Sequence, residues 1–223
     1  MKLKHAINLH KGLTTPFVLG LMVVYQNFTL GAWVYLALHG TYGILWLFKD
    51  RIYPDRQWEQ ETTIGMGVVT FALLGLYWVA PFLLIRSGIV PPLPLVAGAI
   101  ATNIMGVFLH YTSDAQKHYT LKYNPGLITE GFFAKCRNTN YLGEILIYSS
   151  FALLACHWVP WLILAAFVSA VFVPNMRKKD QSLSRYPEFA SYQAQSGLIL
   201  PKLFGLSASS NPTQTDAQSS SEL

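Results

Sequence analysis

The chain is poor in charged residues for its length. Only 12% of its 223 residues are Asp, Glu, Lys or Arg, whereas a soluble globular domain carries about 25%. Hydrophobic residues make up 52%, and they gather in long blocks almost free of charge. Each block is close to the roughly 20 residues that a helix needs to cross a bilayer. This composition argues against a soluble domain and predicts an all-α integral membrane protein.

Several common catalytic and metal-binding motifs are also absent. The sequence has no Walker A, HExxH or GxSxG motif, and Gly65-Met66-Gly67 lacks the strand–turn–helix context of a dinucleotide fingerprint. The six histidines are scattered without ligand spacing, so we expect no metal centre. We expect no disulfide either, because Cys136 and Cys156 are predicted near opposite faces of the membrane.

The apolar blocks predict about six transmembrane helices. We place them at residues 13–25, 29–48, 64–85, 90–111, 142–157 and 158–173. With the N-terminus in the cytosol, fifteen of the sixteen Lys and Arg residues fall inside and only Arg86 falls outside, which is the positive-inside pattern. Both termini are therefore expected in the cytosol, at the endoplasmic reticulum membrane of a eukaryote or the plasma (inner) membrane of a bacterium. The basic charge then requires no nucleic-acid partner.

The organisation is that of one membrane domain with a polar tail. We expect the domain to cover residues 1–205, and residues 177–195 to form an interfacial helix at its C-terminal end. The apolar stripe of that helix would consist of Leu183, Tyr186, Phe189 and Tyr192. Residues 206–223 are rich in Ser, Thr, Gln and Asn, which predicts a disordered tail.

A dense polar stretch, residues 138–144 (NTNYLGE), leads into the fifth predicted span. Glu144 would lie about one turn inside the membrane, where an acid usually indicates a functional site. Asn140 can cap the helix, whose free amides favour an anion, and Lys135 and Arg137 come just before. These residues suit the phosphates and amide of a nucleotide. The alternative is that Asn140 is only a cap and Glu144 pairs with a cytosolic lysine.

Two other polar groups have simple readings when taken alone. Asp114 ends the fourth predicted span as an ordinary helix-end charge. Charged residues at 49–56 follow the second span, which contains His39 and Tyr42. The charges could be solvated, and Tyr42 could be a core or interface aromatic.

Taken together, these motifs resemble the C-terminal domain of the steroid 5α-reductase family. That family includes the sterol reductases and uncharacterised bacterial-type relatives. The resemblance covers residues 103–204 and rests on Asn140-Tyr141-Leu142-Gly143-Glu144, followed by Arg177 and then Arg185-Tyr186-Pro187. Residues 39–54 resemble the earlier half of the family more weakly.

The resemblance implies an NADPH-dependent membrane oxidoreductase. It would reduce a carbon–carbon double bond conjugated to a carbonyl in a lipid or steroid-like substrate. The implied cofactor-binding residues are Asn140, Tyr141, Glu144, Asp114, Arg51, Arg177, Lys178 and Tyr186. The implied catalytic proton donor is Tyr42 or His39. Steroid-acting members carry a glutamate in an early span, and residues 13–16 have none, so the substrate class stays open.

Two alternatives remain. Isoprenylcysteine and related lipid methyltransferases, which use S-adenosylmethionine, share a similar C-terminal architecture. They typically carry Arg-His-Pro where this chain has Arg137-Asn138-Thr139, and this difference, with Glu144, favours the reductase. The other alternative is a non-catalytic membrane relative that retains the nucleotide-site residues.

Overall fold

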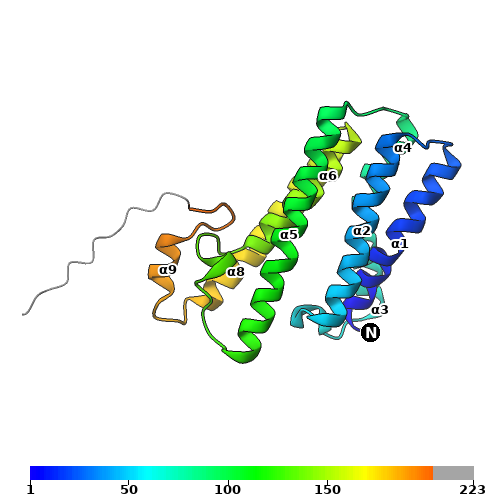
Figure 1. Ribbon diagram of the computed structural model, residues 1–223. Coiled ribbons are helices and arrows are strands. Elements are labelled where there is room, and N and C mark those ends of the chain that lie inside the picture. The colour runs from blue at the N-terminus through cyan, green and yellow to red at the C-terminus, as the bar shows by residue number, and fades with distance from the viewer. Residues whose placement is uncertain (203–223) are drawn as a thin grey trace, which may run out of the picture.

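The computed structural model describes residues 1–202, which form a helical bundle without β-strands apart from two isolated bridges (Figure 1). The predicted tail at 206–223 lies outside the described residues. The elements in chain order are α1 (Leu3–Val24), α2 (Leu30–Ile52), η1 (Arg56–Glu59), α3 (Ile64–Gly75), η2 (Leu76–Trp78), α4 (Val79–Ser87), α5 (Leu93–Tyr123), η3 (Gly131–Phe133), α6 (Thr139–Ala155), α7 (Val159–Phe167), η4 (Val168–Phe172), α8 (Val173–Leu183) and α9 (Phe189–Gln195). All are α-helices except the 3₁₀ turns η1, η2 and η3 and the π-helical turn η4.

Five helical runs are long and apolar enough to cross a membrane. They are Leu3–Val24, Leu30–Ile52, Ile64–Ser87, Leu93–Tyr123 and Val159–Leu183. The remaining predicted span, the fifth at residues 142–157, corresponds to α6, whose 17 residues lie at the short end of the range for a spanning helix. The expected all-α membrane fold of about six spans is confirmed.

The helices extend further into polar sequence than hydropathy predicts. The first span begins at Leu3 rather than at residue 13, so Lys11 lies inside α1 and is only 3% exposed. Lys49 lies inside α2, and Asp114 inside α5, where the two form a buried ion pair. The charges of Lys49 and Asp114 can lie within helices because they pair with each other in the bundle rather than with water.

The prediction of one interfacial helix over residues 177–195 is wrong. Helix α8 continues the last span as far as Leu183, and α9 begins at Phe189. Pro187 lies between them, and a proline disfavours helical backbone at the residue before it. The four residues of the expected stripe therefore do not share one helix.

Helices α5 and α6 are packed against each other along their length (Figure 1). Glycines permit this approach: a Cβ on Gly143 would lie 2.4 Å from the amide nitrogen of His110, and one on Gly106 would lie 2.8 Å from the Gly143 carbonyl oxygen. Further along, Asn103 Nδ2 donates a hydrogen bond to Ser150 Oγ at 2.9 Å. The α5–α6 pair thus has a fixed register.

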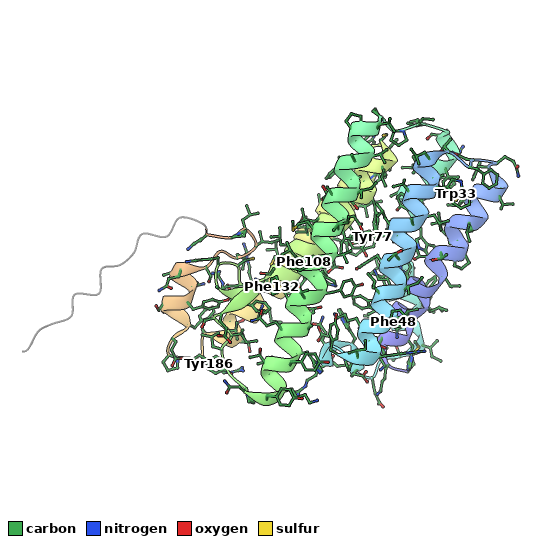
Figure 2. All side chains as sticks on the ribbon, in the orientation of Figure 1. Trp33, Phe48, Tyr77, Phe108, Phe132 and Tyr186 are labelled. Carbon is green, nitrogen blue, oxygen red and sulfur yellow. The ribbon has the colours of Figure 1, made fainter. Side chains whose placement is uncertain are left out.

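Helices α1 and α2 form a second close pair. A Cβ on Gly43 would lie 2.5 Å from the carbonyl oxygen of Lys11. The core lies between the two pairs, and Figure 2 shows Tyr77 there. The ring of Tyr77 stacks on Tyr148 of α6 with centroids 3.6 Å apart. An aromatic core therefore joins the two helix pairs.

The N-terminus lies at the same end of the bundle as the C-terminal ends of α2 and α5 (Figure 1). Backbone bonds join it to the segment before α3: Thr62 N donates to Met1 O at 2.7 Å, and Leu3 N donates to Gln60 O at 3.1 Å. The Glu59 carboxylate accepts hydrogen bonds from Lys2 and Lys4. The segment 56–62 is therefore tied down over this end of the bundle.

Candidate functional site

Three cavities adjoin one another at this end of the bundle. The inner cavity, of about 260 Å³, lies among α1, α3, α6 and η4. The outer cleft, of about 450 Å³, lies between α5 and the α8–α9 segment, and the side cleft, of about 480 Å³, lies between α5 and the end of α2. Asn140 and Tyr141 line both the inner cavity and the outer cleft, and Asp55 lines all three. One ligand could therefore extend from the outer cleft into the inner cavity.

The start of α6 is anchored by its own polar residues. Thr139 Oγ1 donates to the carbonyl oxygen of Phe132 at 2.5 Å, and Asn138 Nδ2 donates to that of Leu198 at 2.8 Å. Asn140 is not the cap of this helix, because α6 begins at Thr139 and its N-cap position is Asn138. The Asn140 side chain is therefore free of the capping role that the sequence allowed.

Asn140 and Glu144 are separated by one turn of α6, so they lie on the same helix face, and both line the inner cavity. Within residues 1–202, neither side chain has a hydrogen-bond partner, and no Lys, Arg or His nitrogen lies within 4.0 Å of the Glu144 carboxylate. The expected alternative, a lysine paired with Glu144, is not what the structure shows. An amide and a carboxylate thus face the cavity with their bonding capacity unused.

His110 of α5 supports the backbone of the same turn. Its Nδ1 lies 3.0 Å from the carbonyl oxygen of Asn140. A carbonyl can only accept, so Nδ1 carries the proton. The His110 Nε2 is buried and has no partner among the described residues. His110 also lines the inner cavity, and its bond holds the backbone of Asn140 in position beside that cavity.

Asp114 lies one turn further along α5 and is 6% exposed. Its Oδ2 accepts a hydrogen bond from Lys49 Nζ at 2.5 Å, while its buried Oδ1 has no partner in the described part of the chain. Both residues line the inner cavity and the side cleft. Asp114 therefore holds Lys49 in place and keeps one acceptor oxygen unused.

The outer cleft is rich in cationic and aromatic side chains. Its cationic residues are Lys117, Lys178, Lys179 and Arg185, and its tyrosines are Tyr141, Tyr186 and Tyr192. Tyr186 lies in the turn between α8 and α9 (Figure 2). Burial raises the pKa of Tyr192 to about 12, and its hydroxyl donates to the carbonyl oxygen of Phe133 at 2.8 Å. This chemistry suits an anionic ligand with a flat ring.

Arg137 has a structural position rather than a place in the cleft. Its guanidinium donates to both oxygens of Asp180, at 3.0 to 3.3 Å, and to the carbonyl oxygen of Ser196 at 2.5 Å. Lys179 donates to the carbonyl oxygen of Arg137 at 2.6 Å and to Asn138 Oδ1 at 3.1 Å. These bonds hold α8 and α9 against the start of α6, and so form the wall of the outer cleft.

The remaining expected cofactor residues divide into two groups. Lys178 and Tyr186 line the outer cleft. Arg51 and Arg177 are exposed and line none of the three cavities. The structure thus brings together Asn140, Tyr141, Glu144, Asp114, Lys178 and Tyr186 around connected space and leaves the two arginines outside it.

The two expected proton donors, His39 and Tyr42, do not line the inner cavity. His39 is fully buried, its Nδ1 lies 3.1 Å from Tyr35 Oη, and its ring stacks on Phe151 at 4.2 Å. Tyr42 is also fully buried, with no hydrogen-bond partner for its hydroxyl among residues 1–202. The Lys11 ammonium lies over its ring, 4.3 Å from the centroid.

The sequence analysis missed Lys11 as a site residue. Lys11 lines the inner cavity from α1, and its Nζ donates to Tyr148 Oη at 2.8 Å. Ile7, Lys11, Thr14 and Val18 are all buried, at the spacing of one helix face. Continuing the apolar periodicity of the first span toward the N-terminus would have placed Lys11 on that face.

Comparison with known proteins gives the family. A family described as a protein of unknown function (DUF1295) matches residues 50–196. The chain belongs to this family. DUF1295 is related to the steroid 5α-reductases, and its match contains Asp114, Asn140 and Glu144 but not α1 or the part of α2 before residue 50. An uncharacterized protein of Schizosaccharomyces pombe, C7D4.09c, is 33% identical over 63 residues. That alignment covers 26% of this chain and 23% of the yeast protein, so the chain spans about a quarter of this relative's length.

Proposed function

We propose that the chain is an NADPH-dependent membrane reductase that acts on a carbon–carbon double bond conjugated to a carbonyl in a lipid. One observation carries the proposal: a cationic outer cleft joins a mainly apolar inner cavity at Asn140 and Tyr141. The relation of the DUF1295 family to the steroid 5α-reductases supports the same reaction class. A soluble charged cofactor and a lipid could thus meet where the two spaces join.

The residues present fit a nicotinamide dinucleotide. The unused amide of Asn140 and carboxylate of Glu144 have the donor and acceptor groups that a carboxamide needs. Lys117, Lys178 and Arg185 offer cations to phosphates in the outer cleft. Tyr186, which lines the same cleft, would stack on a base. Arg51 and Arg177 would reach such phosphates only if the segments that carry them moved.

The residues would act mainly by positioning. Asn140 and Glu144 would orient the carboxamide, and Asp114 would keep Lys49 at the edge of the inner cavity. Leu73, Leu74 and Phe167 line the inner cavity and would exclude water from the reacting carbons. Bound in this way, NADPH would supply a hydride to the β-carbon of the substrate. The substrate oxygen would require a proton or hydrogen-bond donor on the opposite side.

Cofactor binding to the purified protein in detergent tests the proposal. We expect NADPH to quench tryptophan fluorescence, and Glu144→Gln to weaken this binding about 10- to 100-fold, the range for loss of a hydrogen bond to a charged group. The matched control is Glu130→Gln, because Glu130 is exposed and lines none of the three cavities.

The same titrations discriminate the alternatives. Preferential binding of S-adenosylmethionine over NADPH would replace the reductase with a methyltransferase. Binding of neither cofactor would favour a non-catalytic membrane protein. Equal NADPH affinity in the Glu144→Gln and Glu130→Gln proteins would remove the assigned nicotinamide site.

A further inference from the structure

Lys11 is a buried cation without a carboxylate partner. It is 3% exposed and lies in the middle of α1. In the described part of the chain, no Asp or Glu oxygen lies within 4.0 Å of its Nζ. Burial of an ammonium without full compensation costs several kcal/mol. Such a group calls for an explanation beyond packing.

The surroundings of Lys11 satisfy the ammonium only in part. One of its three N–H groups donates to Tyr148 Oη at 2.8 Å. The ring centroids of Tyr42 and Trp46 lie 4.3 and 5.4 Å from Nζ, so cation–π attraction supplies part of the rest. No other hydrogen bond from Nζ forms within residues 1–202. Two donors therefore remain for an oxygen acceptor.

The position of Lys11 indicates what this acceptor belongs to. Lys11 lines the inner cavity together with Glu144 of α6, whereas the Lys49 and Asp114 charges in the same lining are paired with each other. Glu144 attracts donors and Lys11 attracts acceptors. A ligand held between them would present an electron-rich oxygen toward Lys11 and its remaining polar contacts toward Asn140 and Glu144.

The rest of the wall is apolar and extends to the outside of the bundle. Leu73 of α3 and Val171 of η4 both line the inner cavity, and they are 52% and 42% exposed. These side chains face the surface that a bilayer would cover. The π-helical turn η4 lies at this wall, and such turns are frequent at functional sites. The cavity can therefore receive an apolar chain sideways from the membrane, between α3 and η4.

We propose that Lys11 binds the carbonyl oxygen of a lipid that enters the inner cavity between α3 and η4. The catalytic role of this contact rests on the proposed function. The cofactor-binding roles proposed for Asn140 and Glu144 are unchanged. The apolar body of the lipid lies along Leu73 and Val171, and its oxygen accepts a hydrogen bond from the Lys11 ammonium.

The contact supplies the donor that the reduction requires. When hydride reaches the β-carbon, the C=C π pair forms a new double bond from the α-carbon to the carbonyl carbon. The C=O π pair moves to oxygen, which takes a proton from the Lys11 ammonium and gives an enol. The enol takes a proton from water at the α-carbon, and its O–H proton returns to the Lys11 amine, which gives the saturated ketone, hydroxide and the restored ammonium. NADPH is oxidised to NADP⁺. Lys11 is thereby a catalytic residue.

Infrared spectroscopy of a bound carbonyl tests the contact without turnover. The probe is a long-chain alkyl cyclohexenone with a ¹³C-labelled carbonyl, bound to the purified protein in detergent without NADPH. A hydrogen bond from an ammonium lowers the carbonyl stretching frequency. We expect a lowered band in the wild type, and a band at the apolar-solvent position with about 10- to 100-fold weaker binding in Lys11→Met.

Lys4→Met is the matched control, because Lys4 is also on α1 but does not line the inner cavity. We expect its band to match the wild type. Tyr148→Phe keeps Lys11 and removes its protein acceptor, so the lowered band should persist there. Tyr148→Phe also provides a second test if Lys11→Met fails to fold, because loss of the lowered band in it would count against direct contact with Lys11.

Two results would overturn the proposal: an identical carbonyl band in the wild type and Lys11→Met, or no binding of the probe to the wild type. NADPH binding, measured separately by tryptophan quenching, is expected to be unchanged in Lys11→Met. If the wild type did not bind NADPH, the proposed reductase function would be contradicted. The carbonyl contact would then be that of a lipid-binding site.

Discussion

Substitution of Gly143 by alanine is the sharpest test of how the site is held. An added Cβ would lie 2.4 Å from the amide nitrogen of His110 and 2.7 Å from the Gly106 carbonyl oxygen. Ordinary contact begins near 3.4 Å, so α5 and α6 would have to separate by about 1 Å. The obstructing atoms are backbone and cannot turn aside as a flexible side chain can.

The cost can be estimated from these contacts. Overpacking of a close-packed interior costs about 1–3 kcal/mol. Separation of the helices would also break the 3.0 Å bond between His110 Nδ1 and the Asn140 carbonyl oxygen, worth about 1 kcal/mol. The higher helix propensity of alanine returns up to about 1 kcal/mol. We expect Gly143→Ala to lower the free energy of unfolding by about 1–4 kcal/mol.

Thermal unfolding in detergent, followed by circular dichroism, measures this change. The control is Gly98→Ala on the partner helix α5, where an added Cβ meets no atom within 4 Å, and we expect no loss of stability there. NADPH affinity should fall in Gly143→Ala as well, because Asn140 moves with the separated helix. A Gly143→Ala protein as stable as Gly98→Ala would refute the argument from close backbone packing.

A double substitution gives a stricter check. A Cβ on Gly106 would lie 2.8 Å from both the Gly143 carbonyl oxygen and the Ile147 amide nitrogen. Once one alanine has separated the helices, the second has less to displace. The double variant Gly106→Ala/Gly143→Ala should therefore lose less stability than the two single losses added together. Strict additivity would show that the two glycines do not share one contact.

Two further predictions concern ion pairs: that of Asp114 with Lys49, and that of Glu59 with Lys2 and Lys4. Asp114→Asn leaves the buried Lys49 ammonium unpaired, so we expect the free energy of unfolding to fall by about 3–5 kcal/mol. Asp114→Leu combined with Lys49→Met removes both charges and should cost less. Chemical denaturation compares the two proteins, and equal losses of stability would contradict the reasoning. Hydrogen bonds from Lys2 and Lys4 lower the pKa of Glu59 from 4.5 to about 2. Because this carboxyl pKa is depressed in the folded chain, its contribution is complete above pH 4.5 and is lost as the pH falls toward 2. Amide exchange at residues 59–62 should rise over that interval in the wild type, and a Glu59→Gln protein that rises equally would exclude this carboxylate as the cause.

The fold was largely predictable because hydropathy reports burial in lipid directly. Charge-free blocks of about 20 residues predicted the helices, and their order is that of the structure. Hydropathy failed at the helix ends, because Lys49 and Asp114 look solvated one at a time. Their mutual pairing, 65 residues apart, keeps both in buried helix. A pairwise interaction of that range leaves no local pattern in the sequence.

The candidate site was predictable on α6 and much less so on α1 and α2. Polar residues are dense around Asn140 and Glu144, and an acid inside a predicted span indicates a functional site without any knowledge of the fold. On α2, the resemblance alone implied Tyr42 or His39 as the proton donor. Whether a helix residue faces a cavity or the core depends on which neighbours cover it, and here Phe151 of α6 covers His39.

Close glycine contacts explain why Lys11 and Glu144 can act on one ligand. Gly43 brings α2 against the carbonyl of Lys11, and Gly143 brings α6 against α5. Each cavity charge is thus carried on a helix pair whose spacing is set by backbone atoms. The rings of Tyr42 on α2 and Tyr148 on α6, which meet edge to face with centroids 6.0 Å apart, then join the two pairs. Because Tyr148 also accepts the Lys11 hydrogen bond, the ammonium is tied to the helix that carries Glu144. The two charges are therefore held in one frame beside the inner cavity, which is the arrangement that a ligand in contact with both requires.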